Sequence, residues 1–147
     1  MLPGGRHHQE RYVAEFDMID ATAWAAMLLG AFSLAAAIGA LRKPGQWQTM
    51  VREIEQSPAL QLLCGLVELI LGAAVYLANP WIPADILTCI MKAIGGIMMI
   101  EALVVLAFSD LYFHFWLRNL AHMQRAWVVV TLVFGLALTV AGLMRLA

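Results

Sequence analysis

Four long apolar runs dominate this sequence and limit what the chain can fold into. They cover residues 21–41, 59–78, 86–108 and 127–143. At a rise of about 1.5 Å per residue, a helix of this length crosses the roughly 30 Å hydrocarbon layer of a bilayer. Within that layer every backbone N–H and C=O needs an internal partner, which a helix supplies. The sequence predicts an all-α membrane protein: one domain of four transmembrane helices at 21–147 after a polar N-terminal tail at 1–20.

Composition agrees with a membrane setting and excludes several other classes of protein. Of the 147 residues, 63% are hydrophobic and 13% are charged, whereas about a quarter of the residues of a soluble domain are charged. The net charge of −1 leaves no basic surface for nucleic acid. We expect the lipid bilayer as the main partner, other membrane proteins or a second copy of the chain as further partners, and no nucleic acid.

The sequence contains none of the common catalytic or metal-binding motifs. Cys64 and Cys89 lie in different apolar runs, with no CxxC or Cys/His cluster. His114 and His122 are eight residues apart, not the four that place two metal ligands on one helix face. There is no Ser/His/Asp set, phosphate-binding glycine loop or HExxH motif. We therefore expect no metal, no cofactor and no enzymatic activity.

The first connector, between residues 42 and 58, has the pattern of a short amphipathic helix. Its apolar residues recur at i, i+3, i+4 and i+7: Trp47, Met50, Val51 and Ile54. Such a helix lies flat in the membrane interface. Ser57 is expected to cap the second span, with Pro58 in its first turn, where the missing N–H has no cost.

The third connector, residues 109–126, repeats this pattern and predicts a second interfacial helix. Its apolar stripe consists of Tyr112, Trp116, Leu120 and Met123, and its polar stripe of His114, Arg118, His122 and Arg125. Asp110 is expected to be its N-cap. Across both connectors and the short second one, the expected anchors at the membrane surface are Trp47, Trp81, Tyr112, Trp116, Arg118 and Arg125.

The two halves of the chain share one hydropathy pattern. Residues 21–78 and 86–143 have the same length and are offset by 65 positions (21 against 86), and Gly30 corresponds to Gly95. Each half consists of a span, an interfacial helix and a second span. This order suggests an internal repeat in which both halves have the same orientation in the membrane. Residue identity between the halves is low. The alternative is that any four-span chain divides into two hairpins.

Basic residues predict the orientation of the spans. The connectors at 42–58 and 109–126 hold five of them: Arg42, Lys43, Arg52, Arg118 and Arg125. The opposite side holds three: Arg6, Arg11 and Arg145. Because cytoplasmic loops carry the excess of Lys and Arg, we expect a multi-pass protein of the inner (cytoplasmic) membrane with both connectors cytoplasmic and both termini outside.

Three charged residues lie inside the predicted spans: Glu68, Lys92 and Glu101. A charge in the bilayer is costly, so each is a functional candidate. Lys92 and Glu101 are nine residues apart and lie on opposite faces of one helix, so they cannot both face Glu68. Either Lys92 pairs with Glu68, or Glu101 does, in which case the two carboxyls would share a proton. The alternative is a structural role for a protonated glutamate bonded to a neighbouring carbonyl.

Small residues mark the faces on which the spans are expected to pack, since they let helices approach closely in lipid. The predicted packing residues are Gly65, Gly72, Gly95, Gly96, Gly135 and Gly142.

The stretch PALQLLCGLVELILGAAVYLANPW resembles small bacterial inner-membrane proteins with four spans. The shared pattern is carried here by Gly65, Glu68, Gly72, Asn79 and Trp81. The stretch covers about a sixth of the chain. The resemblance implies a bacterial setting and no mechanism, because no activity is established for that group.

Two functions remain open. The first is a non-enzymatic subunit, accessory factor or homo-oligomeric helix bundle, since the chain has no soluble domain and its small-residue stripes suit helix association. The alternative is a small proton- or ion-coupled transporter that uses Glu68 with Lys92 or Glu101. An enzyme acting on lipid ranks last, because the connectors offer no nucleophile, metal site or general base.

Overall fold

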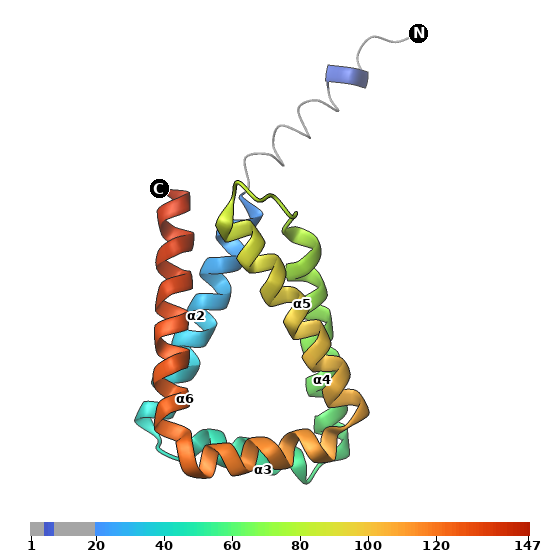
Figure 1. The fold of residues 1–147 in the computed structure, drawn as a ribbon, viewed down its shortest axis with the longest axis vertical. Coiled ribbons are helices and arrows are strands. Elements are labelled where there is room, and N and C mark those ends of the chain that lie inside the picture. Colours follow the sequence, from blue (N-terminus) through green and yellow to red (C-terminus); the bar gives the residue numbers. More distant parts are fainter. Residues whose placement is uncertain (1–4, 8–19) are drawn as a thin grey trace.

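The computed structural model describes residues 5–7 and 20–147, which form helices joined by short turns and no strand (Figure 1). Residues 20–147 fold into α2 (Ala21–Arg42), α3 (Gln46–Glu55), α4 (Pro58–Ala78), α5 (Ile86–Ala107) and α6 (Ser109–Leu146). Of these helices α2, α4, α5 and α6 are long and apolar enough to cross a membrane. The predicted all-α fold with four spans is confirmed. The predicted tail lies almost entirely outside the described residues.

Side-chain caps set where three of the spans begin. Each capping side chain accepts a hydrogen bond from the backbone N–H three residues later, at 3.1 Å for Asp20, 3.3 Å for Ser57 and 3.4 Å for Asp85. These bonds satisfy donors that have no partner in the first turn of a helix. Ser57 and Pro58 take the places predicted for them.

The predicted N-cap of the last helix is wrong. α6 begins at Ser109, directly after Phe108, and no side chain caps it. Asp110 lies inside the first turn, where its carboxylate faces the positive end of the helix dipole instead of bonding a free N–H. The earlier start follows from the very short break between α5 and α6.

α6 combines the predicted interfacial helix and the fourth span in one element that bends at Met123. The φ and ψ of Met123 are −133° and 26°, outside the helical range. The part before the bend lies beside α3, and the part after it runs beside α2 (Figure 1). Met123, predicted on the apolar stripe, is 54% exposed at this bend.

The four spans pack as two antiparallel pairs, α2 with the second part of α6 and α4 with α5 (Figure 1). The pairs converge at one end, where Ala26, Met91 and Leu138 form a buried cluster drawn from both. They diverge toward the other end, where α3 and the first part of α6 lie across the base. We call these the narrow end and the base.

Glycines bring the backbones of α2 and α6 into contact. A Cβ added to Gly30 would lie 2.5 Å from the Thr139 backbone N and 2.7 Å from the Gly135 carbonyl oxygen. One at Gly142 would lie 2.7 Å from the carbonyl oxygen of Ala23. Only glycine allows so close an approach of two helices.

The α4–α5 pair makes the same kind of contact. A Cβ added to Gly95 would lie 2.5 Å from the Tyr76 backbone N and 2.9 Å from the Gly72 carbonyl oxygen. Gly65 faces the Leu106 side chain, which an added Cβ would meet at 2.7 Å. Gly96 is different, because its Cβ would reach only the Tyr76 ring, at 3.7 Å.

Corresponding positions in the two halves make corresponding contacts. The close-approach residues Gly30 and Gly95 are 65 positions apart, and so are the capping residues Asp20 and Asp85. In each pair the first span of one half packs on the second span of the other. These matches favour an internal repeat with exchanged partners over two independent hairpins.

A polar clasp joins the two first spans at the narrow end. Arg145 donates to the Asp20 carboxylate at 2.5 Å and to the Asp85 carboxylate at 2.7 Å. Beside it, the hydroxyls of Thr22 and Thr88 lie 3.4 Å apart. The hydrogen bonds from Arg145 and then Thr88 hold the pKa of Asp85 well below its ordinary value, so the clasp stays charged through mild acid.

Replacing Gly95 with alanine is expected to lower the free energy of unfolding by about 1–3 kcal/mol, the usual cost of overpacking. The added methyl group would meet backbone atoms, which cannot rotate aside. Gly96→Ala is the matched control, because its methyl group makes an ordinary contact. Thermal unfolding of both variants in one detergent measures the difference. Equal melting temperatures would contradict the close approach.

The clasp is expected to stabilise the fold at neutral pH and to lose its effect in acid. A carboxyl whose pKa is lowered by folding stabilises the folded state above its unfolded-state pKa, about 4, and this contribution is lost as the pH falls through the folded-state value. Arg145→Gln should therefore lower Tm equally at pH 7 and pH 6, with a smaller difference from wild type below about pH 4. The exposed Arg125→Gln is the control. A pH-independent difference would count against this role.

Candidate functional site

The carboxyl groups of Glu68 and Glu101 meet between α4 and α5. The contact of Gly72 with Met98 and Met99 sets the register of this antiparallel pair, and Glu68 lies one turn before Gly72. Its carboxyl lies close enough to that of Glu101 for their charges to interact. Both side chains are half-buried. We call Glu68 and Glu101 the carboxyl pair.

Lys92 lies away from the carboxyl pair. Its Nζ donates to the Tyr76 carbonyl oxygen at 3.1 Å and sits 3.6 Å from the centre of the Tyr76 ring. The carbonyl and the face of the ring both attract a cation. Of the two arrangements that the sequence left open, the structure therefore has Glu101 facing Glu68.

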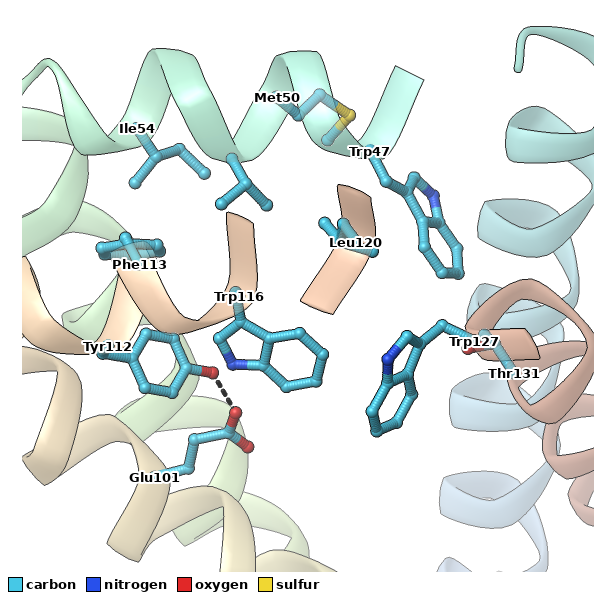
Figure 2. Close-up of a pocket in the computed structure, with 11 residues that line it drawn as sticks. Trp47, Met50, Ile54, Glu101, Tyr112, Phe113, Trp116, Leu120, Trp127 and Thr131 are labelled. Carbon is cyan, nitrogen blue, oxygen red and sulfur yellow. Dashed lines mark hydrogen bonds between the residues drawn. The ribbon is translucent and has the colours of Figure 1, made fainter. Parts of the chain in front are cut away.

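Tyr112 extends the carboxyl pair into α6. Its hydroxyl donates a hydrogen bond to the Glu101 carboxylate (Figure 2). The chain turns sharply at Phe108, so the first part of α6 runs from the end of α5 across the base (Figure 1). Sequence reasoning placed Tyr112 only at the membrane surface. The sequence feature that could have indicated this contact is the sharp turn between Glu101 and Tyr112, which are eleven residues apart.

A cavity of about 440 Å³ adjoins the carboxyl pair at the base (Figure 2). α3 contributes its whole predicted apolar stripe: Trp47, Met50, Val51 and Ile54. The other lining residues are Glu101 from α5 and, from α6, Tyr112, Phe113, Trp116, Leu120, Trp127 and Thr131. The cavity is thus mainly aromatic and aliphatic, with one carboxyl group on its wall.

Three aromatic rings form a continuous wall of this cavity. The ring centres of Tyr112 and Trp116 are 6.3 Å apart, and those of Trp116 and Trp127 are 5.0 Å apart, both in edge-to-face geometry. The indole N–H of Trp127 is buried and has no hydrogen-bond acceptor among the described residues. A buried indole N–H usually has an acceptor, so this unsatisfied donor is unusual.

No basic side chain balances the carboxyl pair in the part of the chain that the structure describes. The cavity is lined by no Lys, Arg or His, and none of the ion pairs found at residues 20–147 involves Glu68 or Glu101. His114, Arg118 and His122 line a separate surface depression. Two adjacent carboxylates without a counterion repel each other, and a proton shared between them would relieve that repulsion.

The remaining predicted residues lie on the surface. Trp81 is 64% exposed in the turn between α4 and α5, and Arg118 and Arg125 are exposed on α6.

Cys64 and Cys89 are free thiols. No group of three or more His, Cys, Asp or Glu able to hold a metal ion occurs among residues 5–7 and 20–147.

Comparison with known proteins finds no match: no family model, no curated protein and no solved structure resembles the chain. Its function is therefore inferred from the chemistry of the carboxyl pair and the cavity.

The shared proton is expected to give a protonated-carboxyl band in the infrared spectrum of the protein in lipid at pH 7. The Glu68→Gln/Glu101→Gln double variant should lose this band, and Tyr112→Phe should shift it, because Glu101 then loses a hydrogen-bond donor. Lys92→Met is the control and should leave the band unchanged. A band that survives in the double variant, or that changes with Lys92→Met, would contradict this assignment.

Proposed function

We propose that the protein is a small proton-coupled membrane carrier that holds its proton on the carboxyl pair. The observation that carries this proposal is the position of Glu68 and Glu101. They face each other inside the spans with no basic partner among the described residues, and Glu101 lines a cavity. Ionisable residues at such positions usually serve ion or proton pathways.

The cavity supports coupling between a proton and a ligand. Glu101 belongs both to the carboxyl pair and to the cavity wall. A ligand that interacts with its carboxylate changes how strongly the pair holds a proton, and by reciprocity the proton changes the affinity for the ligand. The Tyr112 hydroxyl donates a hydrogen bond to Glu101 from the cavity side, so it contacts the carboxyl that would hold the proton.

We place the carrier in the inner membrane of a bacterium, with the base on the cytoplasmic side. Five basic residues in the connectors against three on the other side support this orientation. α3 and the first part of α6 then lie in the cytoplasmic interface, and the cavity opens near that surface. The Arg145 clasp lies at the outer surface, and both termini are outside.

The competing proposal is a subunit, accessory factor or homo-oligomeric bundle. It was motivated by small-residue stripes available to another helix. Gly72 and Gly135 are instead buried against spans of the same chain, which removes most of that support. Native mass spectrometry from the membrane separates the two proposals, because an accessory factor should be released with a fixed protein partner.

A pH step applied to one side of a supported membrane that contains the protein should displace charge. Protonation or deprotonation of the carboxyl pair moves a proton part of the way across the bilayer and gives a transient current even without substrate. The current should be at least roughly tenfold smaller in Glu68→Gln/Glu101→Gln, because this variant has no carboxyl pair to take up or release a proton.

Lys92→Met and Gly96→Ala serve as controls, since both positions lie on α5 and neither contacts the carboxyl pair. They should retain the transient current. An identical current in wild type and in the double glutamine variant, at equal protein density, would exclude a proton-carrying role for Glu68 and Glu101.

A further inference from the structure

We infer that the cavity at the base binds a hydrophobic organic cation, which competes with the proton of the carboxyl pair. This inference rests on the proposed function and names the class of its substrate. Three properties of the cavity support it: the charge on its wall, the aromatic rings around it and its size.

The charge on the wall selects the sign of the ligand. Glu101 is the one ionisable carboxyl among the lining residues, and none of them is basic. Lys92 is held at Tyr76, and Glu55 at the base lies 3.9 Å from His114. In a site of low dielectric constant, an unbalanced carboxylate attracts a cation strongly and repels an anion.

The aromatic wall adds a second attraction for a cation. Trp116, Trp127 and Tyr112 place three adjacent rings beside Glu101 (Figure 2). The face of an aromatic ring attracts a cation, and the attraction grows as water is excluded.

The size and lining favour an apolar cation over a metal ion. The cavity volume, about 440 Å³, lies within the range of roughly 300–1,000 Å³ for small-molecule sites. The aliphatic side chains of Ile54 and Leu120 close it from α3 and α6. A hydrated metal ion would find one carboxylate and no further oxygen cluster, whereas a hydrophobic cation fills the space and contacts the rings.

Binding of a cation should depend on pH. The titratable groups that face Glu101 and Glu68 are Tyr112 from α6 and Cys64 from α4, and neither carries a charge at neutral pH. The proton of the carboxyl pair is therefore the group that the cation displaces. If one proton leaves for each cation bound, the apparent Kd rises by up to about tenfold for each unit of falling pH.

The test compares tetraphenylphosphonium with tetraphenylborate, which share a shape and differ in the sign of their charge. Binding of each to the full-length purified protein is measured by isothermal titration calorimetry between pH 8 and pH 6, with Glu68→Gln/Glu101→Gln in the same detergent as the control for partition into micelles. We expect tetraphenylphosphonium to bind at least tenfold more tightly than tetraphenylborate, and more weakly as the pH falls.

A second measurement uses only the wild-type protein. Tetraphenylphosphonium added to protein in weakly buffered solution should release protons in proportion to the cation bound, and tetraphenylborate should release none. This keeps the test valid if the double variant unfolds. Lys92→Met, which leaves both carboxyls and the cavity wall in place, should retain proton release.

Equal binding of the two ions, or phosphonium binding without proton release, would overturn the inference. The proposed function is tested separately by the pH-step current. A carboxyl-dependent current without phosphonium binding would mean that the substrate class is wrong. If phosphonium binds and releases protons but no current is seen, the inferred cation site would stand and the proposed carrier function would be refuted.

Discussion

The contact between glycines in each helix pair is the interaction on which the rest of the structure depends. In lipid no hydrophobic force drives one apolar helix onto another, so close backbone packing has to supply the attraction. The approach of Gly95 to Gly72 and Tyr76 does this for α4 and α5 and also sets their register. The register places Glu68 opposite Glu101, so the candidate site is a consequence of the packing.

The exchange of partners between the two halves explains the overall shape (Figure 1). Because the first span of each half packs on the second span of the other, the connecting helices must cross from one pair to the other. α3 and the first part of α6 therefore lie side by side at the base, with their apolar faces toward each other. The same arrangement brings the starts of α2 and α5 together, where Arg145 joins Asp20 and Asp85. The cavity and the clasp thus follow from one topology.

The apolar faces at the base also determine how strongly the carboxyl pair attracts a proton or a cation. Water in the cavity would screen Glu101 and weaken its attraction for either a proton or a cation. The rings of Trp116 and Trp127 reduce that screening without offering a basic group that would neutralise the carboxylate. In the proposed mechanism, a proton and a hydrophobic cation compete for this one charge, which is the condition that coupled exchange requires.

Hydropathy and capping patterns predicted the four spans, the Ser57 cap with Pro58 in the first turn, and the apolar face of α3, because these depend on local sequence. The bend at Met123 separates the first part of α6 from the fourth span, close to the predicted boundary. The early start before Asp110 depends on the short break after α5, and the sequence did not predict it. The partner of Glu68 could not be chosen from the sequence, since helical periodicity shows which residues share a face but not what that face meets. Only the glycine contacts between spans decide between Lys92 and Glu101, and those contacts pair residues far apart in the chain. The chemistry of this site is therefore set by helix register, which no single span encodes.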